Sequence, residues 1–385
     1  FILSIMTPKE RVLTTVAHHE PDRLPVGEWG IDHDHVEKIL GKKHSYWRNR
    51  RDETIALWEG RRDELVEGMK EDYVRLIEKL DYDVVPVFLV PPKGYVDPHP
   101  PRKTGDGVWE DDLGRMYKYA ASNDSISCVT PPPARETLSD LEREEVVTQY
   151  RRPFDPSRFE LVDHITRRFG NDRAIVFRGG LVFGQLMGPF GGDQTHQLIL
   201  PMTHPEEIKQ MAPAALEQSQ RLIDELSSRG VLMAMEGKDY CMNTGPIFTP
   251  GSLRDVFFPH QKQVVEQIKA AGMIPFFHCC GRTWEILDDF LEAGWLGYQS
   301  VQKSAGMDWA KLKQEYGDRL TIWAGVSCET LIEGSREDVE HEVREGIDVL
   351  APGGGFIFGS TNSVQYGADT DNYLRALEIA RGFRY

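Results

Sequence analysis

The length, composition and charge of the chain exclude several classes of protein. With 385 residues, 40% of them hydrophobic and 28% charged, the chain is long enough to bury the large core of a globular enzyme. Its formal net charge of -16 argues against a nucleic-acid partner, because phosphate backbones are bound through clustered Lys and Arg. No apolar run reaches the roughly 18 residues of a membrane span, and the opening residues 1–6 are too short for a secretory segment, so we expect a cytoplasmic enzyme.

Eight short apolar runs recur along the chain, at residues 24–29, 84–90, 174–179, 231–236, 273–278, 296–301, 320–325 and 355–360. Their hydrophobicity is nearly continuous, which is typical of parallel strands covered by helices on both faces. Amphipathic segments of crossover-helix length lie between them, at residues 205–228, 252–271, 283–293 and 336–350. This alternation predicts a single α/β domain over residues 7–385 with the fold of a (β/α)8 TIM barrel, and a doubly wound open sheet is the alternative.

Two long insertions interrupt the expected barrel. A charged helical insertion occupies about residues 32–80, and a loop-rich insertion occupies about residues 91–150. Within the second, residues 108–119 predict a β-hairpin. Because long loops of barrels surround the mouth where substrates enter, we expect both insertions to cap it. The apolar segment 181–190 lies between two glycine pairs and predicts either a mobile loop that shapes a pocket or ordinary turns.

Potential ligands are concentrated where the predicted strands end. In a barrel the active site lies at these carboxyl ends, and a bound cation would explain a polar bias among them. The residues at or just after the strand ends are Glu28, Arg178, Glu236, Asp239, His278, Cys280, Gln302, Cys328, Ser360 and Asn362.

Three of these residues predict a metal centre. His278 and Cys280 are two positions apart, so in extended chain both side chains face the same side while Cys279 faces elsewhere. Cys328 follows a later strand and would approach the same point. Imidazole and thiolate ligands favour zinc, and three protein ligands with one open position are typical of a catalytic site. The alternative is a set of ordinary buried thiols beside a hydrogen-bonded histidine.

The remaining candidates surround this centre. The odd number of five cysteines predicts thiols rather than disulfides, with Cys128 and Cys241 structural. Glu236 and Asp239 are candidate catalytic groups, as proton acceptors or a fourth metal ligand, or else they are salt-bridged loop carboxylates. The aromatic residues Trp29, Trp109, Tyr117 and Tyr240 line a substrate pocket or belong to the core. The candidate substrate-binding residues are Glu28, Trp29, Arg178, Tyr240, Gln302 and Asn362.

With these residues the chain resembles the uroporphyrinogen decarboxylase superfamily, and within it the zinc-dependent, corrinoid-linked methyltransferases. The resemblance rests on segments spread over almost the whole chain, at residues 7–26, 245–260, 276–281, 322–331 and 353–365. The His-x-Cys and distant Cys that hold zinc in these methyltransferases correspond to His278, Cys280 and Cys328. True decarboxylases carry an Arg-rich segment after the first strand, whereas this chain has GEWGIDHD at residues 27–34.

The resemblance implies methyl transfer between a small substrate and the cobalamin of a separate corrinoid protein. Because acidic strand ends suit a neutral substrate better than an anionic sulfonated thiol, we favour demethylation of a methoxylated aromatic ether. A methylcobalamin:thiol methyltransferase is one alternative, and a uroporphyrinogen decarboxylase-like enzyme is another. A non-catalytic barrel that binds a tetrapyrrole or corrinoid is a third, although the chain lacks the Asp-x-His-x-x-Gly pattern of cobalamin capture.

Overall fold

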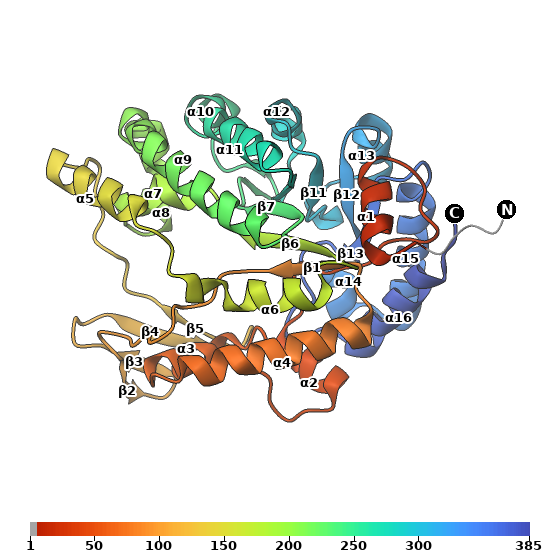
Figure 1. Ribbon diagram of the computed structural model, residues 1–385, viewed down its shortest axis with the longest axis horizontal. Helices are drawn as coiled ribbons and strands as arrows, with labels where there is room; N and C mark the ends of the chain where they lie inside the picture. Colours follow the sequence, from red (N-terminus) through yellow and green to blue (C-terminus); the bar gives the residue numbers. More distant parts are fainter. Residues whose placement is uncertain (1–5) are drawn as a thin grey trace.

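The computed structural model describes residues 6–385 and contains a seven-stranded parallel sheet that curls into a barrel (Figure 1). Residues 1–5, which belong to the opening apolar run discussed above, lie outside the described residues. Each strand overlaps one predicted run. In spatial order the strands are β1 (Val84–Val87), β6 (Ala174–Gly179), β7 (Met233–Gly237), β10 (Ile274–His278), β11 (Gly297–Gln299), β12 (Thr321–Val326) and β13 (Phe356–Ser360).

The eighth predicted run, residues 24–29, closes the barrel without forming a regular strand. Val26 pairs with Phe358 of β13, and Gly27 pairs with Val84 of β1. Two features interrupt the hydrogen-bond ladder: Pro25 has no amide hydrogen, and the Val26 amide donates to the Asp83 carboxylate at 2.8 Å. The prediction of a full strand was therefore wrong, whereas the prediction of a closed barrel rather than an open sheet is confirmed.

Helices cover the outer face of the sheet (Figure 1). The predicted helices at residues 205–228 and 336–350 are confirmed as α9 and α15, and a capping box formed by Ser335 and Asp338 begins the latter. Further helices outside the two insertions are α1 (Pro8–Val16), α6 (Glu160–Phe169), α8 (Gln194–Thr203), α10 (Pro250–Val256), α11 (Phe258–Ala270), α12 (Leu287–Ala293), α13 (Trp309–Tyr316), α14 (Cys328–Glu333) and α16 (Thr370–Gly382).

Two predicted helices are divided in the structure. The segment 252–271 breaks at Phe257 into α10 and α11, because Pro259 at the start of α11 cannot donate the hydrogen bond that a continuous helix requires. The segment 283–293 begins with a 3-10 turn at Trp284–Ile286 before α12. No helix within residues 6–385 combines the length and apolar composition that a membrane span requires.

The interior of the barrel is filled by alternate residues of the strands. Val176, Met235, Phe276, Trp323 and Ile357 form one fully buried cluster. The residues next to them in sequence pack outward, in the layer between the sheet and the helices. Since side chains alternate along a strand, this register decides which side chains at the strand ends face the barrel mouth.

The two segments predicted as insertions contain helices and strands that are not part of the barrel sheet. The first contains α2 (His33–Leu40), α3 (Arg50–Trp58) and α4 (Arg62–Leu80). The second contains α5 (Asp140–Arg151) and a four-stranded antiparallel sheet, which lies beside α3 in Figure 1. Its predicted hairpin is confirmed, with Trp109 opposite Tyr117. The strands are β2 (Arg102–Gly105), β3 (Val108–Glu110), β4 (Met116–Ala120) and β5 (Ser125–Cys128). β2 is fully exposed, so it carries no hydrophobic alternation by which it could be predicted.

The segment 181–190 is helical rather than a loop. It forms α7 (Phe183–Met187) and a 3-10 turn at Gly188–Phe190. Leu186, Met187 and Phe190 are buried in the outer layer, which explains the apolar composition of the segment. A short hairpin of β8 (Cys241–Met242) and β9 (Gly245–Pro246) follows β7 and lies near the barrel mouth.

Candidate metal centre

The alternation along the strands brings one group of strand-end residues into the mouth. His278 continues the inward row of Phe276, and Arg178 continues that of Val176. Gln299 of β11 pairs directly with His278 in the parallel register, so the two side chains face the same side. Trp29 stacks on the imidazole of His278, with ring centroids 4.5 Å apart.

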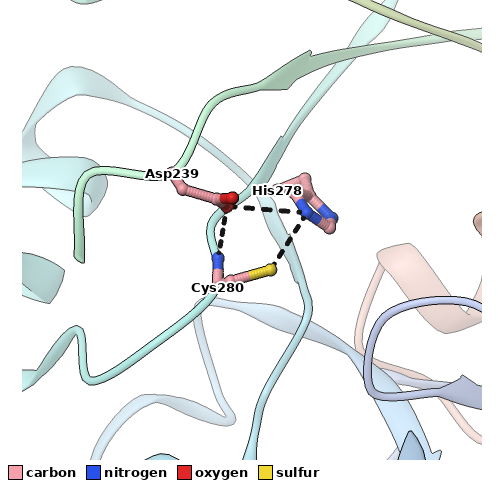
Figure 2. Close-up of side chains that lie close together, drawn as sticks. All are labelled: Asp239, His278 and Cys280. Atoms are coloured by element: carbon pink, nitrogen blue, oxygen red, sulfur yellow. Dashed lines mark hydrogen bonds and ion pairs between the residues drawn. The ribbon is translucent and has the colours of Figure 1, made fainter. Parts of the chain in front are cut away.

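Asp239, His278 and Cys280 form a compact group of metal-ligating atoms (Figure 2). One donor atom of each residue lies within 4.8 Å of the other two. The Nε2 atom of His278 is 3.4 Å from Sγ of Cys280 and 3.7 Å from Oδ1 of Asp239. The backbone amide of Cys280 donates to the same Asp239 oxygen at 2.8 Å, which fixes the carboxylate beside the thiol.

The orientation of His278 suits a metal ligand. Its Nδ1 hydrogen bonds to Oε1 of Gln299, whose amide nitrogen in turn donates to the carbonyl oxygens of Ser360 and Asn362 at 3.3 and 3.0 Å. This arrangement places the hydrogen on Nδ1 and leaves the lone pair of Nε2 toward Asp239 and Cys280. Burial lowers the pKa of His278, against the opposing charge of Asp239, so the imidazole is held in its neutral, ligating form.

The thiol of Cys280 is held by two neighbouring side chains. The amide of Asn362 donates to Sγ at 2.9 Å, and the hydroxyl of Ser300 lies 3.1 Å from it. Ser300 has a φ of 83°, a left-handed conformation that non-glycine residues rarely adopt. Burial, with the charge of Asp239, raises the pKa of Cys280 to about 12, so the free thiol keeps its proton until a cation replaces it.

A tight turn follows Cys280. Gly281 has a φ of 86°, and a Cβ atom there would lie 2.7 Å from the carbonyl oxygen of Met242. Its amide donates to Oε1 of Gln302 at 2.7 Å, so Gln302 supports the turn. Cys279 points to the outer layer, where the Tyr240 amide donates to its sulfur at 3.3 Å.

Cys328 lies at the start of α14 and outside the group of Asp239, His278 and Cys280. Its thiol hydrogen bonds to the carbonyl oxygen of Ser363 at 3.3 Å, and burial raises its pKa to about 11. The segment 361–363 connects the two thiols, because Asn362 contacts Cys280 while Thr361 and Ser363 contact Cys328. The prediction that Cys328 is the third metal ligand therefore stays a prediction. Asp239 is the residue that the structure places beside His278 and Cys280.

Glu28 and Glu236 face outward, away from the barrel mouth. Glu236 accepts hydrogen bonds from the Leu181 and Phe183 amides and so holds the turn that precedes α7. Glu28 accepts from the Ser360 amide at 2.9 Å and from its hydroxyl at 2.6 Å. Burial raises the pKa of Glu28 to about 8 and that of Glu236 to about 7. The substrate-binding role of Glu28 and the catalytic role of Glu236 stay predictions. The hydrogen bonds of the two carboxyl groups hold backbone segments, Ser360 in the case of Glu28 and the turn before α7 in the case of Glu236.

Of the other aromatic candidates, Tyr240 belongs to the core, whereas Trp109 and Tyr117 are half-buried in the sheet of the second insertion. Tyr240 is buried, and its hydroxyl accepts from Gln261 at 2.6 Å in the outer layer. Trp109 and Tyr117 pack against Trp58 of α3. Of the four aromatic residues that the sequence singles out, Trp29 is the one that lines a cavity beside the metal-ligating group.

This cavity has a volume of about 390 Å³ and opens next to His278 and Asp239. Such a volume is within the range of small-molecule sites. Its lining includes Trp29, Phe183, Lys238, Asp239, Phe248 and His278. Arg178 lies behind Trp29, with its guanidinium 5.1 Å from the Trp29 ring centroid and 4.9 Å from that of Phe88.

Sequence reasoning missed Gln299, Ser300 and Lys238. Gln299 and Ser300 lie inside the predicted strand 296–301, so a search limited to the ends of the predicted runs passed over them. The register between β10 and β11 is the signal that identifies Gln299. Lys238 lies between two acidic candidates, and only the cavity distinguishes it.

The donor set fits a divalent transition metal. An imidazole nitrogen, a thiol sulfur and a carboxylate oxygen converge from β10 and the loop after β7, and the imidazole already has the tautomer that a metal requires. These residues are therefore able to hold a metal ion such as zinc.

Comparisons with known proteins agree with this architecture. The sequence profile of the family described as uroporphyrinogen decarboxylase (URO-D) matches residues 133–383. Among curated proteins, none matches the chain. A methyltransferase from Methanosarcina mazei superposes with a TM-score of 0.68 at 18% identity, with 98% of each chain covered.

Two further solved structures are more distant. A protein described as a vitamin-B12-independent methionine synthase from Listeria monocytogenes has a TM-score of 0.45 at 12% identity, over 94% of this chain and 97% of that chain. A rutinosidase from Aspergillus niger has a TM-score of 0.42 at 9% identity, over 95% of this chain and 98% of that chain. At 18% identity the similarity to the Methanosarcina protein shows a shared fold, and the other two structures are too distant to indicate a function.

Proposed function

The chain belongs to the uroporphyrinogen decarboxylase family, and from this premise we propose that it is a zinc-dependent methyltransferase that works with a separate corrinoid protein. The observation that carries the proposal is the convergence of Asp239, His278 and Cys280 beside a cavity with aromatic walls. The shared barrel of the Methanosarcina methyltransferase supports it. The direction that we propose is removal of the methyl group from a methoxylated aromatic ether, with the cobalamin of the corrinoid protein as acceptor.

His278 and Cys280 are the proposed zinc ligands, with Cys328 and Asp239 as candidates for the third position. A zinc ion held by them would polarise the ether oxygen and stabilise the departing phenolate. The protein's own contribution is positioning: Gln299 orients His278, while Asn362 and Ser300 hold the sulfur of Cys280. Cys280 has to release its proton before it binds a cation, because its pKa is raised to about 12.

The cavity supports a small substrate. Trp29, Phe183 and Phe248 offer flat apolar surfaces to a ring, and a volume of about 390 Å³ suits a molecule of one ring better than a four-ring tetrapyrrole. A decarboxylase acting on uroporphyrinogen would need a larger cavity and has no use for a sulfur-containing metal site. These features favour methyl transfer over decarboxylation.

Methyl transfer from methylcobalamin to a thiol is a second candidate function. The expected repulsion between an anionic thiol and acidic strand ends no longer counts against it. The acidic strand ends Glu28 and Glu236 face outward and are satisfied by hydrogen bonds, so they do not repel an anionic thiol in the cavity. In that reaction methylcobalamin would be the donor and the substrate thiolate the acceptor.

The test is turnover of the zinc-loaded chain with a corrinoid protein. Methoxyarenes are offered with cob(I)alamin and thiols with methylcobalamin, and the cobalamin spectrum is recorded. We expect methylcobalamin to form from an ether with the native chain and not with Cys280→Ser. Cys128→Ser is the matched control, because that thiol is exposed and is not part of the metal-ligating group. Loss of methylcobalamin with a thiol would instead establish the second candidate. Unchanged spectra with every ether and thiol, in protein that has bound zinc, would refute methyl transfer.

A further inference from the structure

A lysine ammonium group that has no hydrogen-bond or ion-pair partner in the described part of the chain lines the cavity beside the metal-ligating group. Lys238 follows β7 directly, and its backbone amide donates to the carbonyl oxygen of His278 at 3.3 Å. Its Nζ atom lies 4.1 Å from the centroid of the Phe183 ring. The backbone contact fixes the start of the side chain, and the ring supports its charged end.

Nothing within residues 6–385 neutralises this charge directly. Nζ makes neither a hydrogen bond nor an ion pair with those residues, and Asp239 and Glu236 act on it only through space. Lys238 is half-buried, and its ammonium group lies over the Phe183 ring. An ammonium group that is partly shielded from water and has no charged partner in contact is stabilised by a bound anion.

The carboxylates near Lys238 are committed elsewhere. Glu236 faces the outer layer and holds the turn before α7, while Asp239 accepts from the Cys280 amide beside His278. Arg178, which has no hydrogen-bond or ion-pair partner among the residues that the structure describes, packs against Trp29 and Phe88 and does not line the cavity. Lys238 is thus the positive charge that a molecule in this cavity meets.

We propose that Lys238 anchors an anionic group, a carboxylate or a sulfonate, of the substrate whose reacting end lies at Asp239, His278 and Cys280. The inference rests on the proposed function and narrows its substrate class to small anions. It replaces the expectation of a neutral substrate, which relied on acidic strand ends facing the cavity. Lys238 is in this role a specificity-determining residue.

Equilibrium binding tests the inference without the corrinoid protein. The purified full chain, with and without zinc, is titrated with 3-methoxybenzoate and with its neutral analogue 3-methoxybenzamide, and heat or Trp fluorescence is recorded. A second arm compares 2-mercaptoethanesulfonate with 2-mercaptoethanol. We expect at least one anion to bind about tenfold or more tightly than its neutral analogue, as a charged hydrogen bond gives.

Three variants assign this preference to Lys238. Lys238→Met keeps the length of the side chain and is expected to abolish the preference by lowering the affinity for the anion about tenfold or more. Lys238→Arg keeps the charge and should restore most of it. Lys311→Met is the matched control, because Lys311 also lies over an aromatic ring, that of Trp284 at 4.3 Å, and does not line the cavity.

The outcomes separate the inference from the proposed function. An anion preference that survives in Lys238→Met, or no preference in the native chain, overturns the role of Lys238 even if methyl transfer is observed. A preference that depends on Lys238 supports the role even if no corrinoid protein accepts a methyl group. Thermal unfolding of each variant establishes that it is folded, and the arm that shows the preference distinguishes an aromatic acid from a sulfonated thiol.

Discussion

His278 and Gln299 lie opposite each other on neighbouring parallel strands, and the Nδ1 hydrogen of His278 is donated to the Gln299 side chain. The hydrogen bond fixes both the tautomer and the ring orientation of His278. Gln299 is itself held by the carbonyl oxygens of Ser360 and Asn362, so three strands of the barrel contribute to the placement of one nitrogen atom. Gln299, which is outside the metal-ligating group, thus controls the orientation of one of its members.

Gln299→Ala is predicted to weaken zinc binding by roughly 10- to 100-fold, the usual cost of losing the partner of a metal-bound histidine. The measurement is competition with a chromophoric chelator. Gln263→Ala, on the exposed face of α11, is the control. Equal zinc affinity of Gln299→Ala and the native chain would show that the orientation of His278 does not depend on Gln299.

Cys328→Ser and Asp239→Asn together identify the third ligand. If Cys328 binds zinc, Cys328→Ser lowers the affinity by roughly 100-fold or more, because an atom that binds the metal directly is lost. Asp239→Asn then has the smaller effect. Cys241→Ser is the control, since that thiol is also buried and lies outside the group. Native-like zinc affinity of Cys328→Ser would assign the site to Asp239, His278 and Cys280.

Stability is predicted to fall as the pH rises through the titration of Glu28. The carboxyl has a pKa of about 8 in the folded chain against an ordinary value of 4.5. Between these values the folded state binds more protons than the unfolded state, so the stabilising contribution, complete below about pH 4.5, is lost as the pH approaches 8. Glu28→Gln, which resembles the neutral acid, should remove this slope.

Urea unfolding at pH 5.5 and 8 measures the effect. From pH 5.5 to pH 8 the native chain should lose on the order of 2 to 4 kcal/mol of unfolding free energy relative to Glu28→Gln. Comparing the two proteins at each pH cancels other titrating groups, including Glu236. A difference that does not change with pH would mean that Glu28 is ionised in the folded chain.

Gly281→Ala is predicted to destabilise the fold more than Gly272→Ala. Both glycines have a positive φ, of 86° and 74°, so each substitution carries the cost of about 1 to 2 kcal/mol for a left-handed residue. At Gly281 the new Cβ would also lie 2.7 Å from a backbone oxygen, whereas nothing lies within 4 Å at Gly272. Equal urea midpoints for the two variants would show that the turn after Cys280 can relax.

Much of the fold could be predicted from local pattern. The continuous apolar runs located the seven strands of the parallel sheet, and the amphipathic pattern gave α9 and α15 with the bounds that the structure shows. The failures have local causes that compete with hydrophobicity: Pro25 and the Asp83 carboxylate interrupt the first strand, and Pro259 divides a helix. The exposed strand β2 buries nothing and therefore leaves no hydrophobic signature.

The candidate site was predictable only in part. The His-x-Cys spacing of His278 and Cys280 placed two donors on one side, and the group in Figure 2 contains both. Glu28 and Glu236 also end apolar runs, but they occupy the outward positions of the alternation. Because continuous hydrophobicity hides this alternation in a strand that is buried on both faces, the sequence pattern does not distinguish inward from outward ends.

The amino-acid sequence by itself determined the barrel, the family and the donor pair His278 and Cys280, because each is carried by patterns within short segments of the chain. Tertiary structure alone decided that Gln299 orients His278, that Asp239 lies beside Cys280, and that Lys238 lines the cavity. These relationships join residues at least 21 positions apart, and they follow from strand register and loop packing. Hydrophobic patterning encodes neither.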